Sequence, residues 1–301
     1  MLLGSNGRQK DNAGELSSYI SLRKIADAHS SYEESKYVIF GVPFDQTSSF
    51  RKGSSLAPDA VRIAYDNLES FDAYYGIDFG EIPICDLGNV SVGEDPEEVV
   101  DSVQRITELI RGDNKIPIMI GGEHSITSGA IRNFKDCVMI IIDAHSDFRD
   151  EYMGSKFNHA CITHRAFEEL GENKIFSFGT RSISREEFED KDFKKVKFVR
   201  AEEILKTGIN NAIENAMIPA DSKIYFSIDM DGMDPSYAPA VGTPEPYGIR
   251  DTDVRTLIRK FSKRIIGFDV LEFSPIYDNG NTAVLAAKLI QDFIGSREMK
   301  D

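Results

Sequence analysis

Two short segments of the sequence place aspartate and histidine at alternate positions, a pattern that can bind metal ions. The first contains Asp143, His145 and Asp147, and the second contains Asp229 and Asp231. Successive side chains of an extended backbone point to opposite sides, so residues two positions apart point the same way. Each segment can therefore present its ligands together.

A further histidine, His124, follows two glycines and completes a set of four carboxylates and two imidazoles. This mixture of nitrogen and oxygen ligands suits a divalent ion such as Mn²⁺, and no cysteine belongs to the set. Six ligands are too many for one small ion that must keep an open position, but they serve two ions if two carboxylates bridge. Four carboxylates also balance two divalent ions, as a buried site requires.

Two metal ions about 3.5 to 4 Å apart lower the pKa of a shared water and supply hydroxide at neutral pH. The ligand set therefore predicts a hydrolase. Each motif is weak when taken alone, because an Asp-X-Asp segment after a strand often caps a helix and a histidine in a glycine-rich turn is often structural. The prediction depends on whether the fold brings the segments together.

The elements that must position these residues are short apolar runs alternating with amphipathic stretches, which is typical of a parallel sheet covered by helices. We predict a three-layer α/β/α domain with a mostly parallel central sheet. Helices are expected at 96–111, 125–134, 210–216 and 251–260. Eight strands are expected at 37–41, 82–86, 116–120, 138–142, 175–178, 196–199, 224–228 and 265–270.

The candidate ligands follow directly after predicted strands. His124 follows the third strand, Asp143 the fourth and Asp229 the seventh, while Glu272 follows the eighth. Ligands of such sheets bind beyond the carboxyl ends of the strands. We therefore expect these four strand ends to meet at one edge.

The composition predicts a single soluble domain over residues 1–301, in which 1–31 form a loose arm or a short helix. With 35 basic and 50 acidic residues, the net charge of −15 disfavours nucleic acid and favours a cationic ligand. Residues 1–10 lack the apolar run that a signal peptide needs, and no apolar run is long enough to span a membrane, so a cytoplasmic protein is expected. Cys85, Cys137 and Cys161 show no metal-ligand spacing and are expected to be reduced.

Several longer segments resemble the ureohydrolase superfamily, which includes arginases and agmatinases, and are most similar to archaeal-type agmatinases. The resemblance covers nearly the whole chain after the first few dozen residues. It is carried by GGEHS (121–125), DAHSD (143–147), SIDMDGMDPSYAPAVGTPEP (227–246), GVPFDQTSSFRKGSSLAPDAVR (41–62) and DVLEFSP (269–275).

The resemblance implies two Mn²⁺ ions per chain and a homotrimer or homohexamer. It implies that a bridging hydroxide attacks a guanidinium carbon and releases urea and an amine. It assigns His124 and Asp147 to one manganese, His145 and Asp231 to the other, and Asp143 and Asp229 to both.

Three residues receive catalytic roles from the same resemblance. Asp147 would also accept a hydrogen bond from the hydroxide, and Glu272 would bind the guanidinium through two acceptor oxygens. The alternative for Glu272 is an ordinary salt bridge. His159 would protonate the departing amine, because imidazole titrates close to neutral pH. Ala160 stands where family members commonly have glycine, and His164, on a predicted helix, is the competing proton donor.

The substrate prediction depends on the loop after Asp147. Arginases tend to have an asparagine-containing loop at this point, whereas 148–154 here looks more like agmatinases. Asp150 and Glu151 would suit agmatine, which carries a second positive charge. Arg149 is the counter-argument, since it could bind the carboxylate of arginine or guanidinobutyrate. Arg149 could equally pair with a neighbouring acid.

Two functions of other classes remain open. One is a deacetylase-like amidohydrolase with a single zinc ion, against which the intact DAHSD segment and His124 argue. The other is a non-catalytic protein that has retained the metal site, against which His159 and Glu272 argue. Metal analysis separates the first from the ureohydrolase, and urea release separates the second.

Overall fold

The computed structural model describes residues 23–300. The predicted N-terminal arm therefore lies mostly outside the described residues, since only 23–31 of it can be placed. From Arg23 to Ser31 the chain contains turns and no helix or strand. The prediction of a single domain stays a prediction.

The centre of the molecule is an eight-stranded sheet whose strands all run parallel. Their order across the sheet is β4-β1-β5-β10-β9-β6-β7-β8. The strands are β1 (Tyr37–Val42), β4 (Ile84–Asn89), β5 (Ile116–Gly121), β6 (Cys137–Ile142), β7 (Ile175–Thr180), β8 (Lys197–Arg200), β9 (Lys223–Asp229) and β10 (Ile265–Leu271). The predicted architecture and its eight strands are confirmed.

The boundaries differ by a few residues for local reasons. The strand expected from Ile82 begins at Ile84, because Pro83 has no N–H to donate to a neighbouring strand. A small antiparallel hairpin, β2 (Phe71–Asp72) and β3 (Ile77–Asp78), was not predicted. Both of its strands have only two residues, too few for a periodic pattern to be visible.

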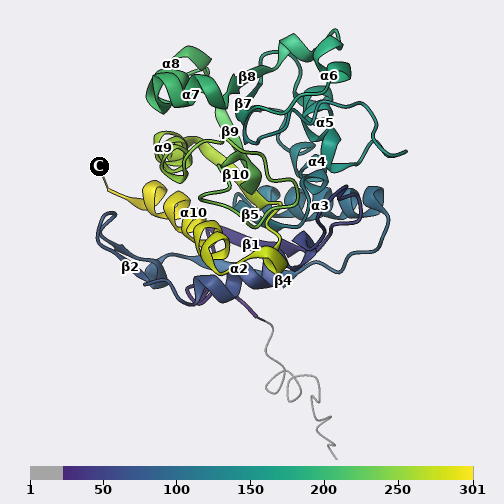
Figure 1. Ribbon diagram of the computed structural model, residues 1–301. Helices are drawn as coiled ribbons and strands as arrows, with labels where there is room; N and C mark the ends of the chain where they lie inside the picture. The colour runs from purple at the N-terminus through teal and green to yellow at the C-terminus, as the bar shows by residue number, and fades with distance from the viewer. Residues whose placement is uncertain (1–22, 301) are drawn as a thin grey trace, which may run out of the picture.

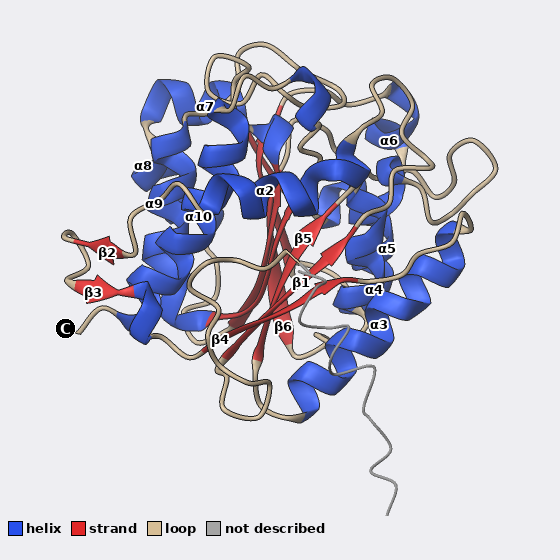
Figure 2. Ribbon diagram, turned by 90° about the horizontal axis from the view of Figure 1, so that it is seen from below, coloured by secondary structure: helices blue, strands red, loops and turns tan. Residues whose placement is uncertain are grey.

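Helices cover both faces of the sheet, with α8, α9 and α10 on one side and α3, α4 and α5 on the other (Figure 2). Each face of the sheet forms its own hydrophobic core with the helices that cover it, the first core with α8, α9 and α10 and the second with α3, α4 and α5. Neighbouring residues of a strand point into different cores. In β6, Ile140 and Ile142 pack in the first core, while Met139 and Ile141 pack in the second. This alternation is the two-residue period of a strand buried on both faces.

The helices of the first layer are α2 (Ala57–Tyr65), α7 (Ala201–Thr207), α8 (Ile209–Ala216), α9 (Asp251–Phe261) and α10 (Asn281–Glu298). The second layer contains α3 (Pro96–Gly112), α4 (Thr127–Ile131) and α5 (Ile162–Leu170), and the short α6 (Arg185–Glu189) follows β7 (Figure 1). Asp95 caps α3 by accepting a hydrogen bond from the amide of Glu97. The stretch predicted as a helix over 125–134 is divided into a 3-10 turn, His124–Ile126, and α4.

None of the helices in the described part of the chain combines the length and the apolar character needed to cross a membrane. Cys85, Cys137 and Cys161 are all buried, and none forms a disulfide with another described residue.

Candidate active site

The predicted metal ligands converge at the carboxyl edge of the four central strands. His124 follows β5, Asp143 follows β6 and Asp229 ends β9, and these three residues offer ligand atoms within 4.8 Å of one another. A second group of the same kind contains Asp143, His145 and Asp231. The two groups share Asp143, as a bridging ligand requires.

Individual distances show how closely the ligands approach. The Nδ1 atom of His124 lies 3.3 Å from Oδ2 of Asp143 and 3.3 Å from Oδ2 of Asp229. The Nδ1 atom of His145 lies 3.1 Å from Oδ2 of Asp231. Asp147 belongs to neither group, although its Oδ2 atom lies 3.8 Å from Nδ1 of His124.

The donor atoms of this cluster fit bound cations better than they fit one another. Nδ1 of His124 and Oδ2 of Asp143 are buried, yet neither has a hydrogen-bond partner among the described residues. Buried polar atoms without partners are costly and rare. The other ring nitrogen of His124, Nε2, lies 3.0 Å from the hydroxyl of Ser227, which leaves Nδ1 free to bind an ion.

The electrostatics of the cluster point the same way. Burial opposes protonation of His124, but Asp143 and Asp147 outweigh it and raise the pKa of His124 to about 9. Burial and the charges of Asp231 and Asp143 raise the pKa of Asp229 well above its usual range. The carboxylates thus crowd negative charge into a space with too little compensation, and divalent cations would relieve it.

Two site residues have backbone conformations that residues other than glycine rarely adopt. Asp147 has φ +46° and Glu272 has φ +61°, both in the left-handed region. Each lies beyond the carboxyl end of a strand, β6 or β10, and both residues line the cavity over the cluster. Strain of this kind persists where the surrounding structure enforces it, and it is common at functional sites.

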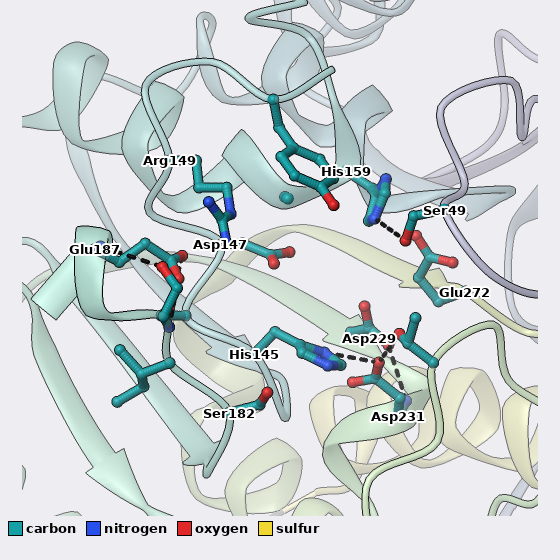
Figure 3. A pocket seen from close by; sticks show the side chains of 16 residues that line it. Ser49, His145, Asp147, Arg149, His159, Ser182, Glu187, Asp229, Asp231 and Glu272 are labelled. Atoms are coloured by element: carbon teal, nitrogen blue, oxygen red, sulfur yellow. Dashed lines mark hydrogen bonds and ion pairs between the residues drawn. The ribbon is translucent and has the colours of Figure 1, made fainter.

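A cavity of about 300 Å³ opens over the cluster, which is the size of a small-molecule site. His145, Asp147, Asp229 and Asp231 point into it, with His159 and Glu272 across from them (Figure 3). The lining residues are Ser49, His145, Ser146, Asp147, Arg149, Tyr152, His159, Ala160, Ser182, Ile183, Ser184, Glu187, Asp229, Asp231, Thr243 and Glu272.

Glu272 is almost fully buried at the end of β10. Its Oε1 atom accepts a hydrogen bond from the amide of His124 at 2.7 Å. Burial, followed by the nearby charge of Glu123, raises the pKa of Glu272 to about 8. A cationic group in the cavity would favour the ionised carboxylate, so this residue is suited to bind a guanidinium.

His159 is placed by the loop that follows β1. Its Nε2 atom lies 3.4 Å from the hydroxyl of Ser49, which also lines the cavity. Burial and the neighbouring His145 lower the pKa of His159 to about 4. This pKa lies well below the near-neutral value expected from the sequence, so the imidazole is neutral at neutral pH and would hold an accepted proton only briefly before donating it.

His164, the competing proton donor, lies in α5 and is not among the residues that line the cavity. Its ring packs against Phe148, and its Nδ1 atom lies 2.6 Å from the guanidinium of Arg165. His159 is thus the histidine that the fold brings to the cavity in addition to the predicted ligands.

The structure does not bring Asp150 and Glu151 to the cavity. The Asp150 side chain is 60% exposed and forms a 2.5 Å ion pair with Arg165, and Glu151 is exposed. The loop instead directs Arg149 and Tyr152 toward the cavity. The guanidinium of Arg149 pairs with Glu186 at 2.8 Å and stacks on the ring of Tyr152, so it already has partners.

Sequence reasoning missed the contribution of the segment after β7. Ser182, Ser184 and Glu187 line the cavity, and Glu187 accepts hydrogen bonds from the Ser146 hydroxyl and the Phe148 amide, both at 2.8 Å. Glu187 therefore fixes the residues on either side of Asp147. The available signal was that β7 also ends at this edge, although no histidine or Asp-X-Asp pattern follows it.

Comparisons with known proteins agree with this geometry. The model of the Arginase family matches residues 35–295. The N(1)-aminopropylagmatine ureohydrolase of Thermococcus kodakarensis is 36% identical, covering 88% of this chain and 91% of the relative. The agmatinase of Pyrococcus horikoshii is 34% identical, covering 87% and 92%. The crystal structure of the agmatine ureohydrolase of Thermoplasma volcanium is 57% identical, with a TM-score of 0.91, and covers 95% of this chain and 98% of that chain.

Proposed function

Since this chain belongs to the arginase family of ureohydrolases, we propose that it is a manganese-dependent agmatinase, which hydrolyses agmatine to urea and putrescine. The observation that carries the proposal is the cavity in which two ligand groups sharing Asp143 face both His159 and Glu272. A metal site without catalysis would not need the last two residues. Neither would it need an open cavity above the ligands.

The six predicted ligands would hold two Mn²⁺ ions. His124 and Asp147 would bind one ion, His145 and Asp231 the other, and Asp143 and Asp229 both. When bound, such a metal pair lowers the pKa of water and supplies hydroxide as a nucleophile at neutral pH. The hydrogen bond of 3.0 Å from Thr243 to Oδ2 of Asp231 would orient one of these carboxylates.

Residues of this chain would bind and orient the substrate. Glu272 offers a carboxylate to the guanidinium, which is a planar fork of donors. Asp147 reaches into the same cavity and can accept a hydrogen bond from the attacking oxygen. Together they would hold the guanidinium carbon in the path of attack, which is the main contribution of positioning to catalysis.

His159 would move the proton that the reaction requires. Because its imidazole is neutral at rest, Nε2 can take up the proton released during attack and pass it to the departing amine nitrogen. The amine then leaves as a neutral group.

The product putrescine would place the enzyme in polyamine synthesis. The family resemblance suggests a cytoplasmic homotrimer or homohexamer.

The substrate preference is a testable consequence. We expect kcat/KM for agmatine to exceed that for arginine by at least about tenfold, or roughly 1.4 kcal/mol. Glu187 is acidic, and Arg149, the arginine that lines the cavity among the described residues, already pairs with Glu186. The carboxylate of arginine would therefore lack a free partner.

The measurement is urea release across agmatine, arginine and guanidinobutyrate. The preference would be refuted if arginine were hydrolysed as well as agmatine and if Arg149→Ala selectively removed the arginine activity. A Glu151→Gln variant is the matched control, because Glu151 is exposed outside the cavity and its loss should leave the ratio unchanged.

N(1)-aminopropylagmatine is the second candidate substrate, because the relative from Thermococcus kodakarensis carries that name. It has the same guanidinium end as agmatine and a longer cationic tail. Adding it to the substrate panel separates the two activities, since a kcat/KM higher than that for agmatine would assign the chain to the longer substrate.

Metal removal is expected to destabilise the protein. A bound ion at about 100 times its Kd stabilises the folded state by about 2.7 kcal/mol, and here the ions also relieve repulsion among buried carboxylates. Thermal unfolding before and after chelation should show a lower Tm that Mn²⁺ restores. An unchanged Tm, in protein that elemental analysis shows to have lost its ions, would argue against this metal site.

A further inference from the structure

We propose that Thr47 and Glu123 are positioning residues that hold His159 in one tautomer, with Nδ1 protonated and Nε2 free to accept a proton from the cavity. The inference rests on the proposed function, which assigns proton transfer to His159. It adds two residues that act on the reaction through His159 and without direct contact with the substrate.

Glu123 is the buried hydrogen-bond acceptor that holds Thr47 in place. Its side chain is 0% exposed, and its Oε2 atom accepts a 2.7 Å hydrogen bond from the Thr47 amide. Its Oε1 atom accepts hydrogen bonds from the hydroxyls of Thr47, at 2.5 Å, and Ser125, at 2.6 Å. Glu123 thus binds both the backbone and the side chain of Thr47.

The single hydroxyl proton of Thr47 then determines the tautomer of His159. A threonine hydroxyl has one proton and two lone pairs, and here the proton is donated to Glu123. The oxygen is left to accept from the His159 amide at 3.0 Å and from His159 Nδ1 at 3.2 Å. For the second bond to form, Nδ1 must carry a hydrogen.

The neutral imidazole consequently has its free lone pair on Nε2. This atom faces Ser49, a lining residue of the cavity, as Figure 3 shows. The arrangement presents the nitrogen that can accept a proton on the side where the substrate would lie. With the opposite tautomer, a hydrogen on Nε2 would block that step.

Backbone hydrogen bonds around Glu123 fix its position relative to Thr47. The Gly122 amide donates to Val42 and the Glu123 amide donates to Phe44, at 2.9 and 2.8 Å, so the loops after β1 and β5 are joined. A Cβ atom on Gly122 would lie 1.8 Å from the Phe44 carbonyl oxygen, so only glycine permits this approach. The loop carrying Thr47 and Ser49 is therefore fixed against the loop carrying Glu123.

The first test compares Thr47→Val, which removes the hydroxyl at nearly constant shape, with Thr47→Ser, which keeps it. We expect Thr47→Val to lower kcat by about 10- to 100-fold, by analogy with the loss of a residue that orients a metal-binding histidine. KM for agmatine and the metal content should change little, and Thr47→Ser should retain most of the activity. Wild-type kcat in Thr47→Val, or an equal loss in Thr47→Ser, would overturn the proposal.

Glu123→Gln is the parallel test of the second residue. The glutamine nitrogen cannot accept a hydrogen bond, so one of the two bonds to Thr47 is lost. We expect a smaller fall in kcat than in Thr47→Val, measured in protein whose metal content matches the wild type. An unchanged kcat would contradict the role of Glu123.

A measurement on the wild-type protein separates this inference from the proposed function, and a variant serves only to assign the signal. ¹⁵N spectra of histidine-labelled protein loaded with diamagnetic Zn²⁺ report which ring nitrogen of His159 is protonated, with the signal assigned by its absence in His159→Gln. The expected result is protonated Nδ1 and unprotonated Nε2, whereas protonated Nε2 would overturn the inference. Absence of urea release, by contrast, would refute the proposed function and leave the tautomer result standing.

Discussion

Asp143→Ala is expected to lower urea release by more than about 10⁴-fold, because hydroxide generation depends on a metal pair and this residue contributes to both ligand groups. Removing its carboxylate weakens the binding of both ions, whereas the loss of His124 or Asp231 weakens the binding of one. Asp229→Ala should cause a loss of the same order, since Asp229 is the second predicted bridge. Elemental analysis should show that each variant loses more than one ion per chain.

Asp150→Ala is the matched control for these variants. It removes the same functional group from the same region of the chain, but its carboxylate is exposed and paired with Arg165 outside the cavity. We expect it to keep two ions and activity close to that of the wild type. Substantial urea release by Asp143→Ala would contradict a bridging role for this residue.

His159→Ala is expected to lower kcat by about 10²- to 10⁴-fold, the usual contribution of general acid–base catalysis. The metal content should stay unchanged, because His159 lies opposite the ligand groups and belongs to neither of them. This combination of lost turnover and retained metal distinguishes proton transfer from metal binding.

His164→Ala is the control for this prediction. His164 packs against Phe148 and contacts Arg165, away from the cavity, so its loss should affect stability more than turnover. The assignment would move to His164 if that variant lost most of its turnover while His159→Ala remained active.

Much of the fold could be predicted because buried strands leave a strong signal. Ile140 and Ile142 face one core and Met139 and Ile141 the other, so the whole of β6 reads as one apolar run. Because parallel strands end at one edge of the sheet, His124 and Asp143 could be predicted to lie close together. The sequence could not reveal the hairpin of β2 and β3, whose strands are too short for periodicity.

Side-chain directions in loops were the part that the sequence could not predict. Asp150 and Glu151 suggested a site for a cationic tail, but the chain turns through positive φ at Asp147, Met153 and Gly154. Arg149 and Tyr152 line the cavity in place of the two acids.

The contact between Thr47 and His159 was equally hidden from the sequence. The two residues are separated by 112 positions along the chain. Their contact depends on how two loops dock at the sheet edge, which follows no local period.

The central claim is that this chain hydrolyses a guanidinium group to urea, and the most direct measurement is the product balance after incubation of the Mn²⁺-loaded protein with agmatine. We expect urea and putrescine in equal amounts, with no product once the metal has been removed. Ammonia in place of urea, or no urea from any guanidine of the panel although two ions are bound, would contradict the account.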